Sequence, residues 1–155
     1  MPSATDTLPT PLKVGTKAPA FNKVVATGGI SISLKDFEGS FLVMVFYPKD
    51  STPGCTRQLC ALRDDLADFS AANTKVIGVN QGSLNSHENF VAKQSYNFPI
   101  LVDEGSKIAQ AYGAQKENGG TQRTVYIINP QGQIIFAEQG MPTDQTLLEA
   151  VKAAS

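Results

Sequence analysis

Cysteine and histidine are scarce in this chain, which has two cysteines and one histidine among its 155 residues. Zinc sites usually take three or four cysteine, histidine or carboxylate ligands, and His87 is far from Cys55 and Cys60 in the sequence. We therefore expect no metal site. A disulfide-rich secreted scaffold is also excluded, because such scaffolds use many cysteines. A structural bridge between Cys55 and Cys60 would close a loop so short that it would stabilise little.

Excess charge and long apolar runs are missing as well. The 14 acidic and 13 basic residues leave a net charge of −1, which gives no electrostatic reason to bind nucleic acid or an anionic membrane. No apolar run approaches the roughly 20 residues that a membrane-spanning helix needs. The first 15 residues hold no apolar segment of the signal-peptide type. We therefore expect no nucleic-acid partner, no membrane and a cytoplasmic location.

The length and hydrophobic content fit one globular unit with a sizeable core. Hydrophobic residues make up 41% of the chain, as in ordinary soluble proteins. The first residues are rich in proline, serine and threonine, which is typical of a mobile terminus. We predict a flexible tail over residues 1–12 and a single domain over residues 13–155.

Strand and helix patterns alternate along most of the chain and end in a hairpin. Strands are expected over 22–34 (two short strands around Gly28-Gly29), 41–47, 74–80, 98–103, 123–129 and 133–139, and helices over 53–69, 86–96, 106–113 and 143–154. Ser86 is the expected N-cap of the second helix, and Thr143 or Asp144 that of the last. Pro99 indicates an edge strand or an irregular strand start. The order predicts an α/β three-layer sandwich with a mixed central sheet, helices on both faces and an N-terminal hairpin.

The two cysteines lie in the segment YPKDSTPGCTRQLC, residues 47–60, between a buried strand and a helix. Thr52 suits an N-cap and Pro53 the first helical position. Cys55 then falls in the first turn, where free N–H groups and the helix dipole favour an anion. A thiol pKa of about 8.5 is lowered in such a place, so Cys55 is a candidate nucleophile.

The five-residue spacing of the cysteines has a geometric consequence. Leu59, Leu62, Leu66 and Phe69 share one apolar stripe, and Cys55 lies at its edge. On an ideal helix the Cα atoms of Cys55 and Cys60 are about 8.6 Å apart. A disulfide needs about 7 Å or less, so a bond between them requires the helix to unwind, with Pro53-Gly54 as the weak turn. The alternative is two inert buried cysteines, a common environment for this residue.

The segment FYPKDSTPGCTRQLC resembles the active-site segment of the peroxiredoxins. It is most similar to the subfamily named for bacterioferritin comigratory protein, also called peroxiredoxin Q. The family pattern of Pro, three residues, Thr or Ser, two residues and Cys is matched by Pro48, Thr52 and Cys55. The subfamily often carries a second cysteine five positions later, matched by Cys60. The resemblance runs from about Leu12 to the C-terminus.

Two downstream segments extend the resemblance. SHENFVAKQSYNFPILVD (86–103) is similar to a serine-histidine helix and following strand of the subfamily. RTVYIINPQGQI (123–134) is similar to the segment with the family's catalytic arginine, which maps to Arg123. The chain departs from the common Ser-x-Asp at Asn80-Gln81-Gly82, and from a common Ile-Asp at 127–129. We expect these departures to alter surface contacts and the choice of partner.

The resemblance implies a thioredoxin-like fold and reduction of hydrogen peroxide and organic hydroperoxides. Cys55 would be the peroxidatic thiolate and become a sulfenic acid. Cys60 would be the resolving thiol and form an intramolecular Cys55–Cys60 disulfide. A thioredoxin or glutaredoxin-type dithiol would reduce that disulfide by exchange. No metal or organic cofactor is implied, and a monomer is expected.

The same resemblance assigns roles around the cysteine. Thr52 and Arg123 would bind the peroxide, with Arg123 also lowering the pKa of Cys55. Pro48 would shape the pocket and shield the sulfenic acid. Gly54 and Phe46 would line the substrate site. His87, a lone histidine without an obvious partner, is expected to be a surface residue at a helix start rather than a catalyst.

Two other functions are compatible with a pair of neighbouring thiols. A thioredoxin-type oxidoreductase acting on proteins would carry Cys-x-x-Cys, whereas this chain has four residues between its cysteines. A redox-regulated interaction protein would unwind the helix on oxidation and expose Leu59 and Leu62. Apolar-dye binding and client-aggregation assays on the reduced and oxidised protein separate this role from catalysis.

Overall fold

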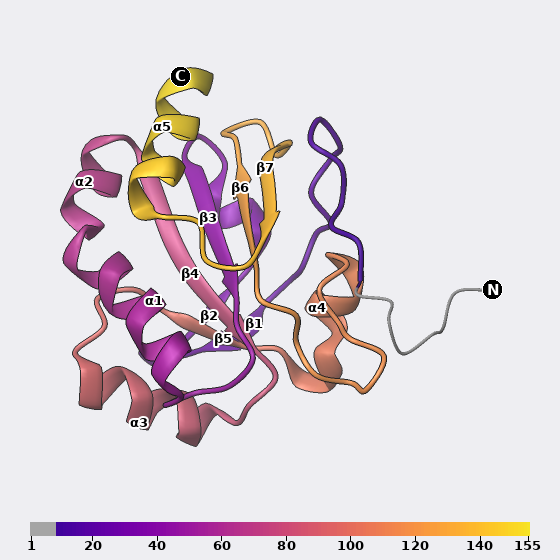
Figure 1. The fold of residues 1–155 in the computed structure, drawn as a ribbon, viewed down its shortest axis with the longest axis vertical. Helices are drawn as coiled ribbons and strands as arrows, with labels where there is room; N and C mark the ends of the chain where they lie inside the picture. Colours follow the sequence, from indigo (N-terminus) through magenta and orange to yellow (C-terminus); the bar gives the residue numbers. More distant parts are fainter. Residues whose placement is uncertain (1–8) are drawn as a thin grey trace.

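The computed structural model describes residues 9–155, except for the side chain of Cys55. Its elements are β1 (Val24–Ala26), β2 (Ile30–Ile32), η2 (Leu34–Phe37), β3 (Phe41–Phe46), α1 (Pro53–Asp64), α2 (Leu66–Ala71), β4 (Thr74–Asn80), α3 (Leu84–Gln94), β5 (Ile100–Val102), η3 (Glu104–Ser106), α4 (Lys107–Ala111), β6 (Thr124–Ile128), β7 (Ile134–Gln139) and α5 (Asp144–Ala154). The strands form one mixed sheet in the order β2-β1-β5-β4-β3-β6-β7 (Figure 1).

Strand β3 is the centre of this sheet. It pairs in parallel with β4 and antiparallel with β6. All six of its residues are buried, as its unbroken apolar sequence predicts. Because alternate side chains of a strand point to opposite faces, β3 contributes to two separate cores.

The two cores lie on opposite faces of the sheet. On one face Val43 and Val45 pack with apolar residues of α1, α2, α3 and α5. On the other face Leu42, Met44 and Phe46 pack with α4 and the segment around Phe21. Figure 1 shows α1, α2 and α5 on one side of the sheet and α4 on the other. The arrangement confirms the predicted three-layer sandwich, and β1 and β2 form its predicted N-terminal hairpin.

The predicted helix over 53–69 is in fact two helices. The chain leaves helical geometry at Asp65, where φ is −99° and ψ is 7°, and resumes it at Leu66. The apolar stripe nevertheless continues across the break, because Leu59, Leu62 and Phe69 are all buried against the sheet. A pattern of apolar spacing does not detect a one-residue break that leaves the buried face in register.

Three boundary predictions need correction or choice. Helix α3 begins two residues earlier than expected, because its N-cap is Ser83 and not Ser86. The Ser83 hydroxyl accepts a hydrogen bond from the Ser86 N–H. Strand β5 lies between β1 and β4 and is not an edge strand, so Pro99 marks an irregular start. At α5 the N-cap is Thr143, whose hydroxyl accepts from Thr146 N–H.

Part of the predicted flexible tail is docked on the body of the protein. Residues 1–8 lie outside the described residues. The Leu12 N–H donates to the Tyr126 hydroxyl at 2.9 Å, and the Gln139 side chain donates to the Pro9 carbonyl. A Cβ on Gly113, which has a φ of +65°, would lie 2.5 Å from the Thr10 carbonyl oxygen. Contacts with the body therefore begin before the predicted boundary at residue 12.

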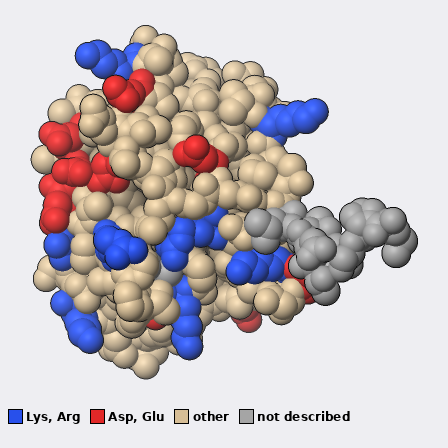
Figure 2. All heavy atoms as spheres, in the orientation of Figure 1, with Lys and Arg blue, Asp and Glu red and all other residues tan. Residues whose placement is uncertain are grey.

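Charged side chains are interspersed on the face shown in Figure 2, with acidic residues gathered on the side where α2 lies in Figure 1. No helix among residues 9–155 is long and apolar enough to span a membrane. Asp144 of α5 lies near Asp64 and Asp65 at the junction of α1 and α2. Burial, together with these carboxyl groups, raises the pKa of Asp144 to about 7.

Replacing this carboxyl group should change how stability depends on pH. A folded-state pKa raised from 3.8 to about 7 means that the folded protein binds more protons than the unfolded chain between these values. The associated stability is present at low pH and lost as the pH rises through about 7. Because Asp144 is only partly buried and its charge is screened by solvent, we expect Asp144→Asn to be more stable than the wild type by roughly 1 kcal/mol near pH 8.

Urea unfolding across that pH range measures the effect. The advantage of Asp144→Asn should shrink steadily as the pH is lowered toward about 4. Asp68→Asn removes an exposed acid from α2 and serves as the control, with a small difference that varies little with pH. A constant difference for Asp144→Asn at every pH would contradict the assignment.

Candidate active site

The carboxyl end of β3 is where the predicted site residues meet. Pairing of Phe46 with Thr124 on β6 places Arg123 beside the residue that follows β3. Pairing of Phe46 with Val79 on β4 does the same for Asn80 on the other side. The loop from Tyr47 to Thr52 leaves this point and enters α1. The register of the central strands therefore fixes which residues surround the helix start.

Both cysteines belong to one unbroken helix. Pro53 is the first residue of α1 and Cys55 the third, so the Cys55 backbone lies in the first turn as predicted. The Cys55 side chain lies outside the described residues. Cys60 lies further along α1 and carries a free thiol. Helix α1 is therefore intact across both cysteines, and ideal helix geometry separates their Cα atoms by more than a disulfide allows.

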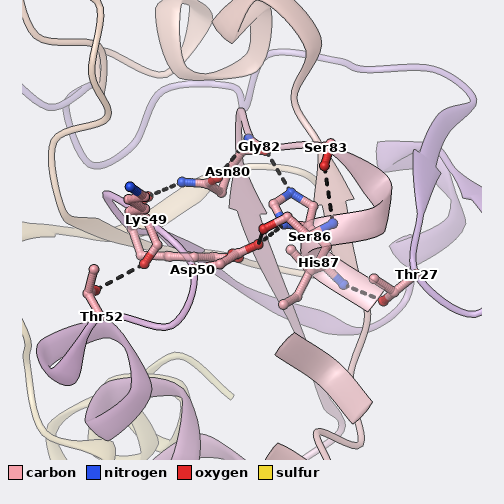
Figure 3. Close-up of polar contacts among 11 residues, drawn as sticks. Thr27, Lys49, Asp50, Thr52, Asn80, Gly82, Ser83, Ser86 and His87 are labelled. Atoms are coloured by element: carbon pink, nitrogen blue, oxygen red, sulfur yellow. Dashed lines mark hydrogen bonds and ion pairs between the residues drawn. The ribbon is translucent and has the colours of Figure 1, made fainter. Parts of the chain in front are cut away.

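Thr52 occupies the N-cap position, but its side chain does not cap the helix. Its hydroxyl donates to the Lys49 carbonyl at 3.0 Å, as Figure 3 shows, and makes no capping bond. The main-chain carbonyl of Thr52 accepts from Thr56 N–H at 2.8 Å. The capping prediction was therefore right about the position and wrong about the side chain. The hydroxyl instead closes the loop on itself, next to Ser51, whose φ is +62°.

Arg123 lies against the first turn of α1. Its Nη1 donates to Gln58 Oε1 at 2.8 Å. A Cβ built on Gly54 would lie 3.2 Å from Nη2, so the guanidinium occupies the side of Gly54 toward which a side chain would point. The predicted residues Gly54 and Arg123 thus lie next to each other, at the turn of α1 that contains the Cys55 backbone.

Gln58 contacts Arg123 and was not among the residues predicted from the sequence. It is 8% exposed and lies one turn after Gly54 on the same face of α1. Its side-chain amide oxygen, Oε1, accepts the hydrogen bond from Arg123 and holds the guanidinium in place. The signal was available in the helical spacing, since positions three and four residues after Cys55 and Gly54 share their face.

The other two predicted site residues, Pro48 and Phe46, differ in their burial. Pro48 is exposed in the loop, so its shielding role stays a prediction. Phe46 is fully buried on the face of the sheet opposite α1, in ring contact with Tyr112 and Tyr126. Its role at the substrate also stays a prediction, and its packing gives it a role in the core.

Cys60 occupies a half-buried site between α1 and the end of α3. Its Sγ lies 3.6 Å from Gln94 Oε1 and 3.6 Å from the Tyr96 hydroxyl. That hydroxyl also donates to the Thr56 carbonyl at 3.4 Å, and Arg63 donates to the Gln94 carbonyl at 2.6 Å. These contacts hold the Cys60 side of α1 against α3.

A buried polar cluster lies on the other side of the loop. Asp50 accepts hydrogen bonds from the Tyr47 hydroxyl at 2.6 Å and the Ser86 hydroxyl at 2.7 Å. Its Oδ2 also lies 2.6 Å from Nδ1 of His87. Burial by itself raises the pKa of Asp50, but the hydrogen bonds from His87, Tyr47 and Ser86 outweigh it and lower the pKa below its usual value. Figure 3 shows Ser86 and His87 converging on this carboxylate.

The expectation that His87 is a surface residue was wrong. Its side chain is 0% exposed, and its ring lies between Asp50 and the Asn80 carbonyl. The sequence shows a serine-histidine pair at a helix start. It does not show that the buried face of that helix packs over a loop 36 residues earlier, so the partner of His87 was not visible.

The departure at 80–82 is also partly buried rather than on the surface. Asn80 is 3% exposed, and its amide nitrogen donates to the Tyr47 carbonyl at 2.7 Å. Its amide oxygen accepts from Gly82 N–H at 2.7 Å. A Cβ at Gly82 would lie 2.9 Å from that oxygen and 3.2 Å from Cε1 of His87. Asn80 and Gly82 therefore fit together. Asn80 binds the first residue of the loop from Tyr47 to Thr52, and Gly82 lies beside His87.

The site lies on a fold of the thioredoxin class, with a cysteine in the first turn of the helix that follows the central strand. Residues 14–137 match the AhpC/TSA family. Peroxiredoxin Bcp of Xanthomonas campestris pv. campestris is 36% identical over 118 residues, which cover 72% of this chain and 74% of that protein.

Solved structures agree with this match. A mutant of PrxQ from Xylella fastidiosa has a TM-score of 0.86 at 28% identity, over 94% of this chain and 98% of that one. The bacterioferritin comigratory protein of Xanthomonas campestris, solved as trapped intermediate and ligand complexes that address its alkyl peroxide reduction activity, has a TM-score of 0.79 at 33% identity, over 84% and 90% of the two chains. The chain belongs to the AhpC/TSA family, among the peroxiredoxins of the Bcp and peroxiredoxin Q type. Its reaction class is that of a thiol-dependent peroxidase.

The contacts of Cys60 predict how readily its thiol reacts in the folded protein. Tyr96→Phe removes the hydroxyl next to Sγ and the Thr56 carbonyl while the ring can keep its stack on Phe98. In a Cys55→Ser background, we expect a disulfide reagent to label Cys60 about two- to fivefold faster, because local opening between α1 and α3 becomes easier.

Tyr112→Phe is the matched control for this measurement. Its hydroxyl donates to the Pro19 carbonyl on the other face of the sheet, so labelling of Cys60 should proceed at the parent rate. If Cys60 is labelled at the same rate in Tyr96→Phe and in Tyr112→Phe, the Tyr96 hydroxyl does not restrain this part of the helix.

Proposed function

We propose that the protein reduces hydrogen peroxide and organic hydroperoxides through a thiolate at Cys55. The sulfur attacks one oxygen of the peroxide, the O–O bond breaks, and the other oxygen leaves as water or an alcohol after taking up a proton. Cys55 is thereby oxidised to a sulfenic acid. Activity on organic hydroperoxides is supported by the related bacterioferritin comigratory protein of Xanthomonas campestris, whose structures address alkyl peroxide reduction.

The position of Arg123 is the observation that carries this proposal. Its guanidinium contacts Gly54 and is held by Gln58, so a fixed positive charge lies at the turn that contains the Cys55 backbone. A cation and a helix start both favour a thiolate over a thiol. The same charge can stabilise the negative charge that develops on the breaking O–O bond. Thr52, at the N-cap, is proposed to bind the peroxide together with Arg123, with Pro48, Phe46 and Gly54 around them.

The second step of the proposal uses Cys60. Its thiol attacks the sulfenic sulfur of Cys55, water leaves, and an intramolecular disulfide forms. A thioredoxin or glutaredoxin-type dithiol then reduces the disulfide by exchange and restores both thiols. Because Cys55 and Cys60 share the intact helix α1, this step requires α1 to unwind. We further propose that the enzyme acts as a monomer in the cytoplasm.

Cysteine replacements test the two steps separately. Cys55→Ser should lose essentially all turnover of peroxide with thioredoxin and thioredoxin reductase, because no thiolate remains to attack. Cys60→Ser should consume one equivalent of peroxide and then stop. Intact-mass measurement should find a sulfenic acid in this variant and a disulfide in the wild type. Wild-type turnover by Cys55→Ser would exclude the proposed reaction.

The demand for unwinding gives a further prediction at Gly54. Alanine in place of glycine stabilises a helix by up to about 1 kcal/mol, so Gly54→Ala should slow disulfide formation severalfold. Its methyl group would also lie 3.2 Å from Nη2 of Arg123 and push the guanidinium aside. We therefore expect the peroxide-dependent first step to slow as well. Stopped-flow measurements separate the steps, because only the first depends on peroxide concentration.

Thr56→Ala is the matched control for the helix effect. It raises helix propensity in the same helix by about 0.5 kcal/mol without placing a new atom against Arg123. It should slow disulfide formation and leave the first step unchanged. If both variants form the disulfide at the wild-type rate, unwinding of α1 does not limit that step.

A further inference from the structure

The pair formed by Asp50 and His87 lies outside the proposed chemistry, yet it is attached to the active-site loop. Asp50 is two residues before Thr52, and its side chain is 5% exposed. The His87 ring comes from α3 and is fully buried. Burying two titratable groups is costly unless they compensate each other, so the pair indicates a specific use.

Both ring nitrogens of His87 have hydrogen-bond partners, and these partners favour one protonation state of the ring. Nε2 lies 3.1 Å from the Asn80 carbonyl oxygen, which can only accept, so Nε2 carries a proton. Nδ1 lies 2.6 Å from Oδ2 of Asp50, a carboxylate that also accepts from two hydroxyl groups. With an acceptor beside each ring nitrogen, the geometry fits a ring that donates from both, which is the imidazolium form.

The groups that contact the Asp50–His87 pair are mostly uncharged. The loop contributes Asp50, α3 contributes the uncharged Ser86, and β4 contributes the Asn80 carbonyl. The other titratable group in the described contacts is Tyr47, which reaches the pair through Asp50. A doubly protonated ring would therefore face the Asp50 carboxylate without a competing ionised partner in these contacts.

The Asp50–His87 pair is attached to a loop that contains a residue in an unfavourable backbone conformation. Ser51 has a φ of +62°, a conformation that serine rarely adopts. On one side of Ser51, Asp50 is anchored to α3, and on the other the Thr52 hydroxyl bonds back to Lys49. The position of Thr52 and the start of α1 relative to Arg123 therefore depends on where Asp50 is held.

We propose that His87, as an imidazolium ion paired with Asp50, is a positioning residue that holds the loop from Tyr47 to Thr52 so that Thr52 and the first turn of α1 face Arg123. The proposal rests on the proposed peroxidase function, because the residues being positioned are those of that reaction. His87 itself touches neither the peroxide nor the sulfur. It acts through Asp50 and the loop.

The ring can be observed directly because His87 is the only histidine in the chain. In the wild-type protein labelled with ¹⁵N-histidine, we expect the two ring nitrogens to show the shifts of a doubly protonated ring at neutral pH. Asp50→Asn should convert the spectrum to that of a neutral ring. A neutral wild-type ring protonated at Nε2 alone would overturn the ion pair, and this result does not depend on whether any variant folds.

The positioning role is measured by the reactivity of Cys55 without peroxide. In a Cys60→Ser background, we expect His87→Gln to slow alkylation of Cys55 by iodoacetamide about fivefold near pH 6, with equal rates near pH 9.5, because the displaced loop weakens stabilisation of the thiolate. A variant that was only less stable would open more often and label faster at every pH. An unchanged pH profile, or faster labelling throughout, would overturn the proposal.

Two further variants sharpen the result. Lys93→Gln removes a positive charge from an exposed position of the same helix and should leave the alkylation profile unchanged. Asp50→Asn combined with His87→Gln should be no slower than the slower single variant, since the pair acts as a unit. Additive losses would show that the two residues act independently and would overturn the pairing.

Failure of the inference and failure of the proposed function give different results. If His87→Gln shifts the alkylation profile but the wild type does not turn over peroxide, the positioning role stands and the peroxidase function fails. If the wild type turns over peroxide and His87→Gln has the wild-type alkylation profile, the function stands and the positioning role fails.

Discussion

The register of β3 between its two neighbours is the constraint on which the site depends. The antiparallel pairing with β6 places Arg123 beside the end of β3, and the parallel pairing with β4 places Asn80 on the opposite side. A shift of either strand by one residue would turn the buried side chains to the wrong face. The two cores that enclose β3 therefore also fix the geometry around the helix start.

The sequence predicted most of what local chemistry controls. The buried strand, the helix start at Pro53 and the first-turn position of Cys55 follow from residue patterns that act over a few positions. Gln58 could have been found in the same way, from its spacing to Gly54 along the helix. Arg123 could be assigned through family resemblance, because it comes from a distant strand that no local pattern connects to α1.

The parts that could not be predicted depend on packing between distant segments. The environment of His87 requires the position of α3 over the loop, which is set by Phe90 and other apolar residues packing on the sheet. Asn80 and Gly82 are a second case. Each substitution alone looks like a surface change, but the Asn80 amide occupies space that a Cβ at position 82 would need. Their compatibility is visible once the Asn80 side chain and the Gly82 backbone are seen in three dimensions.

The loop from Tyr47 to Thr52 is firmly held by hydrogen bonds, whereas the first turn of α1 is weakly stabilised. The loop is held by a buried carboxylate with three hydrogen-bond partners and by the Asn80 amide on the Tyr47 carbonyl. The first turn of α1 has proline and glycine at its first two positions and no side-chain cap from Thr52. Backbone N–H groups that are not capped remain able to stabilise an anion, and a turn with weak helix formers is easy to open. In the proposed reaction, the same features would favour a thiolate at Cys55 and let α1 unwind toward Cys60, while the loop in front of it stays anchored.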